Sequence, residues 1–315
     1  MIYIVIFIVI IILLILCIRI CFALCMTTEN LQDDLKINHL KIFTMVKDEV
    51  DIIEDWVRYH ASIFGYDSIF VIDNFSTDGT YEVLKKFQSK GIHLSRKHDY
   101  KLKGYYMQEL ISRYCDGNTL AFPIDSDEFI ILYKDKQIIT DKTTILDYLF
   151  NLPTRSMYKA NYITSIIPPH KPEGYDRATT ETEHGYYIDM GQVAKTFIYT
   201  GLFKGKIDHG NHISSNDYML TDIALIHFPF RNNDQLKSKS KNNVLGLGYP
   251  DDLVQLKNII KENPNCSGCH NVKIYIDVLE NNINILEIAI PSQQNVEYIP
   301  LDHFTNYINN MNTPF

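Results

Sequence analysis

The sequence predicts an α/β fold with an open, mostly parallel sheet flanked by helices. Short apolar segments of strand length alternate with amphipathic segments of helix length over residues 41–124. Clusters of polar residues directly follow several apolar segments, as ligand-binding loops do at the carboxyl ends of parallel strands. A long apolar stretch at the N-terminus also predicts a transmembrane helix ahead of this domain.

The first half of the chain supplies the regular alternation. Its apolar runs are short and rich in β-branched and aromatic residues, which favours strands. Asp48 can cap the helix that follows the first strand, and Gly65 ends that helix. The predicted strands are residues 41–46, 68–73, 92–95 and 119–124, and two further predicted helices are residues 79–90 and 105–115.

The second half of the chain is less regular. Residues 163–186 contain several prolines and glycines, which predicts a long loop. Residues 271–290 alternate weakly and fit either a helix or a strand. The remaining predicted elements are strands at residues 193–200 and 222–228 and helices at residues 233–242 and 251–262.

Residues 1–26 are apolar except for Arg19. Residues 2–18 alone would form about 25 Å of helix, against a hydrocarbon core of about 30 Å, and the apolar run resumes after Arg19. We therefore predict a single-pass membrane anchor at residues 1–26, with residues 2–26 in the membrane. A cleaved signal peptide fits less well, because the run is long, has no basic start and precedes no clear cleavage site. A buried helix is the third interpretation.

Charge says little about orientation but excludes one class of partner. Arg19 alone favours a cytoplasmic body only weakly, so the side of the membrane stays open. The net charge of −8 argues against a nucleic-acid-binding protein, which needs a basic surface. Beyond the anchor we predict a stalk at residues 27–39, the α/β domain at residues 40–262 and a C-terminal extension of unassigned structure at residues 263–315.

Three of the six cysteines lie in the predicted anchor, and the other three, at positions 115, 266 and 269, are too few for a disulfide framework. Residues 266–270 read C-S-G-C-H, which matches the attachment pattern of c-type haem. A structural zinc site needs four ligands, and no second cysteine pair accompanies this one. A local disulfide or two free thiols is therefore the favoured interpretation.

The sharpest chemical feature is the pair of carboxylates in Asp125-Ser126-Asp127, directly after a predicted strand. Carboxylates at this spacing can hold Mg²⁺ or Mn²⁺ and leave positions open for phosphate oxygens. Such an ion would neutralise charge on a departing diphosphate. In a chain with 38 acidic residues the pair alone is a weak signal, and its position at a strand end strengthens it.

A second polar cluster, residues 73–80, also follows a predicted strand. Turn and helix-cap chemistry explains part of its composition. Asp73 can also accept hydrogen bonds from a nucleobase or from ribose hydroxyls. We expect residues 47–49, 73–80 and 125–128 to converge at one edge of the sheet.

Together these motifs resemble those of family 2-type glycosyltransferases, which have the GT-A fold. Residues 71–80 (VIDNFSTDGT) resemble the strand and turn of that family. Residues 122–129 (FPIDSDEF) resemble its D-x-D segment.

Further segments resemble a subgroup related to family 92. Residues 46–60 resemble its K-N-E…E-W-x-x-Y-H start, with Asp48 in place of asparagine. Residues 210–212 and 226–239 resemble its G-x-H and H-Y/F-x-x-R…K elements. The resemblance covers about residues 40–245, and the motifs are specific jointly rather than singly.

The resemblance implies a metal-dependent enzyme that moves a sugar from a nucleoside-diphosphate sugar to an acceptor hydroxyl, with inversion. Asp125 and Asp127 would hold Mn²⁺ or Mg²⁺, with His227 as a further ligand. Asp73 would contact the base or ribose of the donor. The other residues it implies for donor binding are Glu49, Asn74, Lys195 and Arg231.

An inverting transfer also needs a base that deprotonates the acceptor hydroxyl. His212 is the first candidate, followed by Asp208 and Glu183, and a solvated loop residue is the alternative interpretation of each. The sequence leaves the donor sugar open, and the acceptor can be a glycan, a protein or a lipid.

Two other functions compete with this one. A sugar nucleotidyltransferase would usually carry a glycine-rich loop after the first strand, and this sequence has none there. An inactive, membrane-anchored binding protein of the same fold is the other alternative, and the intact carboxylates at positions 73, 125 and 127 argue against it.

Overall fold

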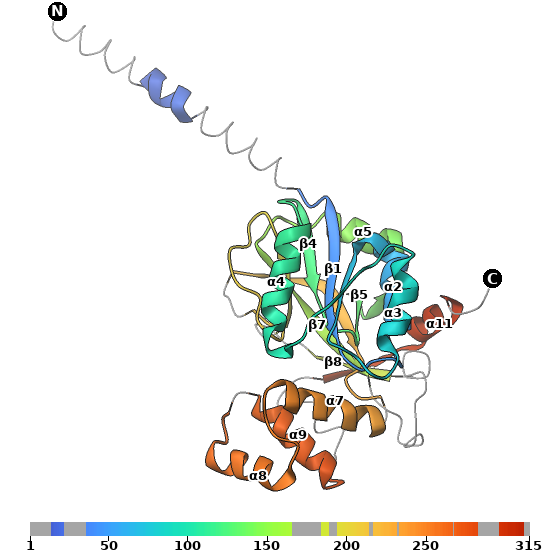
Figure 1. Ribbon diagram of the computed structural model, residues 1–315. Coiled ribbons are helices and arrows are strands. Elements are labelled where there is room, and N and C mark those ends of the chain that lie inside the picture. The colour runs from blue at the N-terminus through green and yellow to red at the C-terminus, as the bar shows by residue number, and fades with distance from the viewer. Residues whose placement is uncertain are drawn as a thin grey trace, which may run out of the picture.

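The fold is a mixed sheet with helices on both faces and a small group of helices at one edge (Figure 1). It is seen in a computed structural model of the chain. The structure describes residues 14–21, 36–165, 184–188, 194–213, 217–231, 233–266, 268–282 and 296–311.

One half of the sheet is parallel and comes from the first part of the chain. β1 lies between β2 and β4 and pairs in parallel with both, and β2 pairs in parallel with β3. Val46, the last residue of β1, lies opposite Asp73, the last residue of β2, so the carboxyl ends share one edge. These strands are β1 (His39–Val46), β2 (Ile69–Asp73), β3 (His93–Arg96) and β4 (Thr119–Pro123).

The other half of the sheet is largely antiparallel, so the prediction of a mostly parallel sheet is wrong. A connection between parallel strands needs a dozen or more residues, and only residues 124–127 join β4 to β5. β5 therefore runs back in the opposite direction and pairs antiparallel with β10. Asp135 and Lys136, both at positive φ, close a two-residue hairpin between β5 and β6. The sheet order is β3-β2-β1-β4-β9-β7-β10-β5-β6, with β8 between β7 and β11. The remaining strands are β5 (Glu128–Lys134), β6 (Gln137–Ile139), β7 (Met157–Ser165), β8 (His184–Ile188), β9 (Lys195–Tyr199), β10 (Met219–His227) and β11 (Val296–Pro300).

Helices cover both faces of the sheet because each has one apolar side. Trp56, Leu84 and Phe304 belong to the larger buried core on one face, and Met107 and Ile111 belong to a smaller core on the other. The larger core is covered by α2 (Ile53–Phe64), α3 (Thr80–Gln88), α5 (Lys142–Phe150) and α11 (Asp302–Met311), and the smaller by α4 (Lys103–Tyr114). Two short 3₁₀ turns are η1 (Tyr66–Ser68) and η2 (Tyr100–Leu102).

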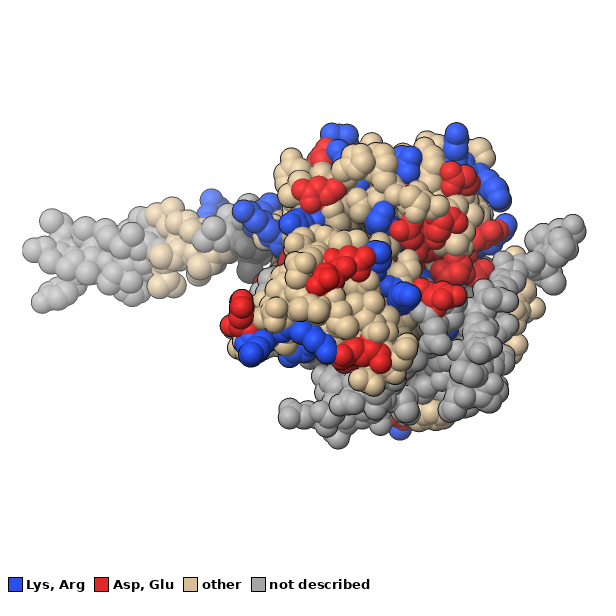
Figure 2. Space-filling model, turned by 60° about the horizontal axis from the view of Figure 1, so that its bottom comes forward, with Lys and Arg blue, Asp and Glu red and all other residues tan. Residues whose placement is uncertain are grey.

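Three further helices form a group with its own core at the carboxyl edge of the parallel strands (Figure 1). They are α7 (Asn233–Gly246), α8 (Leu253–Glu262) and α9 (Cys269–Leu279). Leu236 and Val244 of α7 pack with Val272 and Tyr275 of α9. Seen from this end, the described surface carries acidic and basic side chains that are interspersed (Figure 2).

Most predicted elements are present within a few residues of their expected bounds, and α9 forms where the sequence allowed no assignment. Among the described residues, no helix is both long and apolar enough to cross a bilayer. Of the predicted anchor, residues 14–21 are helical, and the rest lies outside the described residues. Residues 166–183, in the predicted long loop, also lie outside them.

His60 of α2 gives the larger core a pH-dependent contribution. Its Nδ1 donates to the Trp56 carbonyl oxygen (2.9 Å), its Nε2 accepts from the Ile130 N–H (3.3 Å), and its side chain has no exposed surface. Burial lowers its pKa to about 3, whereas in the unfolded chain a histidine pKa is about 6.5. Below about pH 6.5 the unfolded state therefore binds the extra proton, and folding stability falls as the pH falls.

We expect His60 to contribute at most about 1.4 kcal/mol of lost stability per pH unit below about pH 6.5. In urea unfolding, the difference in unfolding free energy between wild type and His60→Gln should shrink as the pH falls from about 7 to about 5. Parallel pH profiles for the two proteins would contradict this assignment.

Candidate functional site

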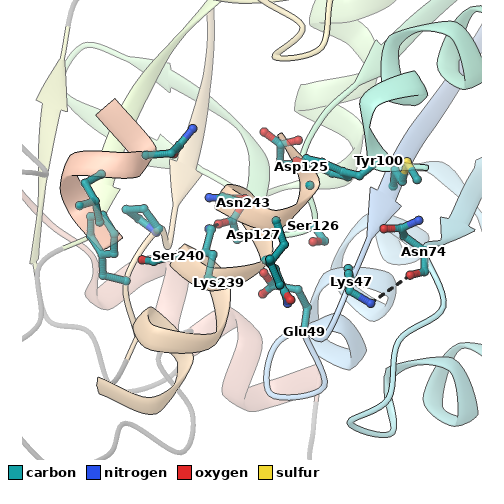
Figure 3. Close-up of a pocket in the computed structure, with 18 of the residues that line it drawn as sticks. Lys47, Glu49, Asn74, Tyr100, Asp125, Ser126, Asp127, Lys239, Ser240 and Asn243 are labelled. Carbon is teal, nitrogen blue, oxygen red and sulfur yellow. Dashed lines mark hydrogen bonds and ion pairs between the residues drawn. The ribbon is translucent and has the colours of Figure 1, made fainter. Parts of the chain in front are cut away.

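A cavity of about 670 Å³ lies at the carboxyl edge of the parallel strands, where the α7–α9 group meets the sheet (Figure 3). It brings together residues from all three polar clusters that the sequence placed at this edge. Its polar lining includes Lys47, Glu49, Asn74, Asp99, Tyr100, Lys101, Asp125, Ser126, Asp127, His227, Lys239, Ser240, Asn242, Asn243, His270 and Asn271.

The Asp125-Ser126-Asp127 turn is held rigidly at the cavity wall. Trp56 Nε1 donates to the carbonyl oxygens of Asp125 (3.1 Å) and Glu128 (2.9 Å). Glu128 Oε2 in turn accepts from the Asp125 N–H (2.8 Å). Because β4 and β5 fix both ends of the turn, the two aspartate side chains are presented to the cavity in a set orientation.

Two ammonium groups hold the Asp125 carboxylate. Lys195 Nζ lies 2.9 Å from one oxygen, and Lys103 Nζ contacts the other. Both lysines are almost fully buried, whereas a third of the Asp125 side chain is exposed. Burial alone would raise the pKa of Asp125, but the two ammonium groups outweigh burial and hold the pKa well below its usual range.

Asp127 has a different set of neighbours. Lys239 of α7 forms an ion pair with Asp127 Oδ2, and His227 Nε2, at the end of β10, lies 3.6 Å from the same oxygen. Burial opposes ionisation here too, but the nearby cations keep the pKa of Asp127 well below its usual range. Asp127 is therefore ionised across the physiological pH range.

Arg231 does not face the cavity as predicted but is buried beside it. Its Nε lies 2.6 Å from Asp51 Oδ2, its Nη1 donates to the Phe228 carbonyl oxygen (3.0 Å), and its Nη2 pairs with Glu49. Only 1% of its side chain is exposed. Arg231 thus orders the loop after β1, and through it Glu49, rather than offering a free guanidinium to a ligand.

Asp73 also differs from its predicted place. It has no exposed surface, and its carboxylate accepts from Arg96 Nε (2.7 Å) and from the Ser76 N–H (3.1 Å). The register of β2 and β3 sets this pair, because Asp73 lies opposite Arg96. Asn74, the next residue, reaches the cavity instead, with its Nδ2 donating to the Lys97 carbonyl oxygen (2.7 Å).

Asp48 stands where the K-N-E pattern has asparagine, at a backbone position that either residue can adopt. Its φ of 54° lies in the left-handed region, which asparagine and aspartate enter more readily than most residues. Its carboxylate accepts from the Thr77 N–H (2.7 Å) and from Asn242 Nδ2 of α7 (3.1 Å). Asp48 therefore ties the first two polar clusters to the α7 helix.

Lys195, predicted to pair with the diphosphate, is fully buried behind Asp125. Besides Asp125 it contacts Glu128 Oε1 (2.9 Å) and donates to the Gly210 carbonyl oxygen (3.1 Å). Its charge is therefore used to hold the turn.

Two of the candidate bases, Asp208 and His212, lie on the loop whose Gly210 carbonyl oxygen Lys195 contacts. Asp208 Oδ1 accepts from the His212 N–H (2.9 Å), which closes the turn between them. Neither is among the described residues that line the cavity. Glu183 lies outside the described residues.

Several residues that line the cavity or hold its carboxylates escaped the sequence prediction. Lys103 lies four residues before Met107 and eight before Ile111, so it continues the buried face of α4, a spacing visible in the sequence. Lys239 follows the buried Leu236 by three residues. Tyr100, whose ring meets His209 edge-on at 4.6 Å, gave no signal beyond its residue type.

The side-chain atoms near Asp127 include some, but not all, of the ligands that a divalent cation needs. A carboxylate oxygen and an imidazole nitrogen lie 3.6 Å apart, and Asp125 faces the same cavity. Among the described residues, no three His, Cys, Asp or Glu side chains are close enough to hold an ion by themselves. Mg²⁺ commonly binds one or two carboxylates and completes its shell with substrate phosphates and water, so the incomplete protein shell is compatible with an ion that arrives with a phosphate ligand.

Cys266 and Cys269 form a disulfide, which confirms the local-disulfide interpretation. The bridge leaves neither sulfur free to ligate zinc or to attach haem. It lies at the start of α9, next to His270 of the cavity wall.

Comparison with known proteins gives only distant likeness. No protein-family model matches the chain, and no curated protein matches it. Staphylococcus aureus TarS 1–349 in complex with UDP aligns at 10% identity over 87% of this chain and 88% of that chain, with a TM-score of 0.38. Glucosyl-3-phosphoglycerate synthase from Mycobacterium tuberculosis, in complex with Mn²⁺ and UDP-glucose, aligns at 12% identity over 68% and 80%, with a TM-score of 0.37. At these values the likeness establishes neither the family nor the activity of this chain.

Proposed function

We propose that the chain is a metal-dependent glycosyltransferase of the family 2 type, which transfers a sugar from a nucleoside-diphosphate sugar to an acceptor hydroxyl with inversion. One observation carries the proposal: both carboxylates of the Asp125-Ser126-Asp127 turn line a cavity of about 670 Å³ at the carboxyl edge of the parallel strands. That volume suits a ligand of nucleotide-sugar size.

The charges around the cavity support a diphosphate ligand. Three lysines line the cavity: Lys47 directly after β1, Lys101 in η2 and Lys239 in α7. Ammonium groups bind phosphate oxygens as point charges. Asn74 and Tyr100, on the side of β2 and η2, supply an amide and an aromatic ring for the nucleoside.

Asp127 and His227 would hold the divalent cation, with Asp125 beside them. The cation would neutralise the charge that develops on the departing diphosphate. Asp127 is suited to this role because its low pKa keeps it anionic. We assign the acceptor base to the Asp208–His212 loop or to Glu183, since inversion needs a base opposite the leaving group.

To test this proposal, the 315-residue chain is incubated with a panel of UDP-, GDP- and ADP-sugars in the presence of Mn²⁺, Mg²⁺ or EDTA, and release of nucleoside diphosphate is measured. At least one donor should release its nucleoside diphosphate, and EDTA should abolish the release. If no nucleoside diphosphate binds by calorimetry and no donor is consumed with either metal, the proposal is wrong.

A further inference from the structure

Lys239 differs from the other lysines that hold the carboxylates of the turn. Lys103 and Lys195 are 3% and 0% exposed, and Lys195 is also bound by Glu128 and the Gly210 carbonyl. Lys239 is 24% exposed and lines the open cavity. Asp127 is the carboxylate it pairs with, so this ammonium has room to leave its partner whereas the other two do not.

The α7 helix explains why Lys239 is placed there. Leu236, Ser240 and Val244 recur at spacings of four and are buried, which fixes the rotation of the helix. Asn242 on the same helix is bound to Asp48 on the loop after β1. The long side chain of Lys239 therefore starts from a fixed backbone position and extends to Asp127 across the cavity (Figure 3).

A cation at Asp127 would compete with this ammonium. The oxygen that Lys239 contacts, Asp127 Oδ2, is also the oxygen 3.6 Å from His227 Nε2. Two like charges at contact distance repel strongly beside a carboxylate that is only 4% exposed. An ion bound between Asp127 and His227 would therefore displace the ammonium, whose flexible stem can turn to another anion.

We propose that Lys239 is a transferable counter-ion: it pairs with Asp127 when the cavity has no donor, and it moves to the donor's diphosphate when a divalent cation takes Asp127. This inference rests on the proposed function, because it takes a diphosphate as the ligand. It assigns Lys239 to donor binding, and it explains how the carboxylate stays paired without the donor.

Calorimetry on the full-length chain separates this role from a structural one. In Lys239→Gln, Mn²⁺ added alone should bind about tenfold more tightly, because its competitor is gone. UDP added in saturating Mn²⁺ should bind about tenfold more weakly, because one charge-assisted contact to the diphosphate is lost. GDP and ADP are titrated in parallel, and the nucleotide that binds wild type most tightly is used for the comparison.

Lys237→Gln is the matched control. Lys237 lies on the same helix and is exposed, so its substitution removes the same charge without touching Asp127. Both affinities should stay at the wild-type value. Lys239→Met, a second uncharged variant, should repeat the opposed pattern if the glutamine variant fails to fold.

The outcomes distinguish the two proposals. If wild type binds Mn²⁺ and a nucleoside diphosphate but the Lys239 variants weaken both ligands or neither, the counter-ion role is wrong and the proposed function stands. If wild type binds no nucleoside diphosphate, the proposed function itself fails.

Discussion

Replacing Asp127 with asparagine is expected to lower kcat/KM for sugar transfer by about a thousandfold, the size of a loss of several kcal/mol of transition-state stabilisation. Asparagine keeps the shape of the side chain but removes the anionic oxygen that lies near both His227 and Lys239. Steady-state rates of nucleoside diphosphate release in Mn²⁺ give the measurement.

The fold should survive this change, which makes the kinetic result interpretable. Lys239 is 24% exposed, so water can solvate its ammonium once Asp127 is neutral. Asp234→Asn is the matched control, because Asp234 is an exposed carboxylate in the first turn of α7. A rate within tenfold of wild type for Asp127→Asn, in a protein with an unchanged melting temperature, would show that Asp127 does not take part in the transfer.

The sequence predicted which chain segments meet at the site better than which side chains face the cavity. Parallel strands end at one edge, so the strand endings alone place Glu49, Asn74, Asp125 and Asp127 together. The Asp125-Ser126-Asp127 turn was predictable for the same reason. Its rigidity was not, because Trp56 reaches it from a helix 69 residues earlier in the chain.

Ion pairing explains the residues whose predicted places differ. The predicted third strand ended at position 95, one residue before Arg96. Arg96 is the residue that forms the ion pair with Asp73. Lys239 meets Asp127 across 112 residues of sequence, and no local pattern encodes such a pair. Carboxylates at a crowded sheet edge need counter-charges, but sequence alone does not say which lysine or arginine supplies each one.

Replacing Arg231 with methionine should cost about 3–5 kcal/mol of folding stability near neutral pH, because it leaves a buried carboxylate without its partner. Arg231 is 1% exposed, and it forms ion pairs with Glu49 and Asp51. Methionine has similar length and fills the space, so the loss is electrostatic rather than a cavity effect. Urea unfolding with a matched surface control measures it: Arg58→Met breaks the half-exposed pair with Glu54 and should cost less than about 1 kcal/mol.

A double variant tests whether the unpaired carboxylate is the cause of this instability. Adding Glu49→Gln to Arg231→Met removes the buried charge, so the double variant should be more stable than Arg231→Met alone. Burial already holds the pKa of Glu49 above its usual range, and losing the Arg231 guanidinium raises that pKa further, so the single variant should regain stability on mild acidification. Glu49 then takes up a proton on folding. This uptake stabilises the native state increasingly as the pH falls towards the pKa that Glu49 has in the unfolded chain. If the double variant is no more stable than Arg231→Met, the arginine acts through packing and its hydrogen bond to the Phe228 carbonyl rather than through Glu49.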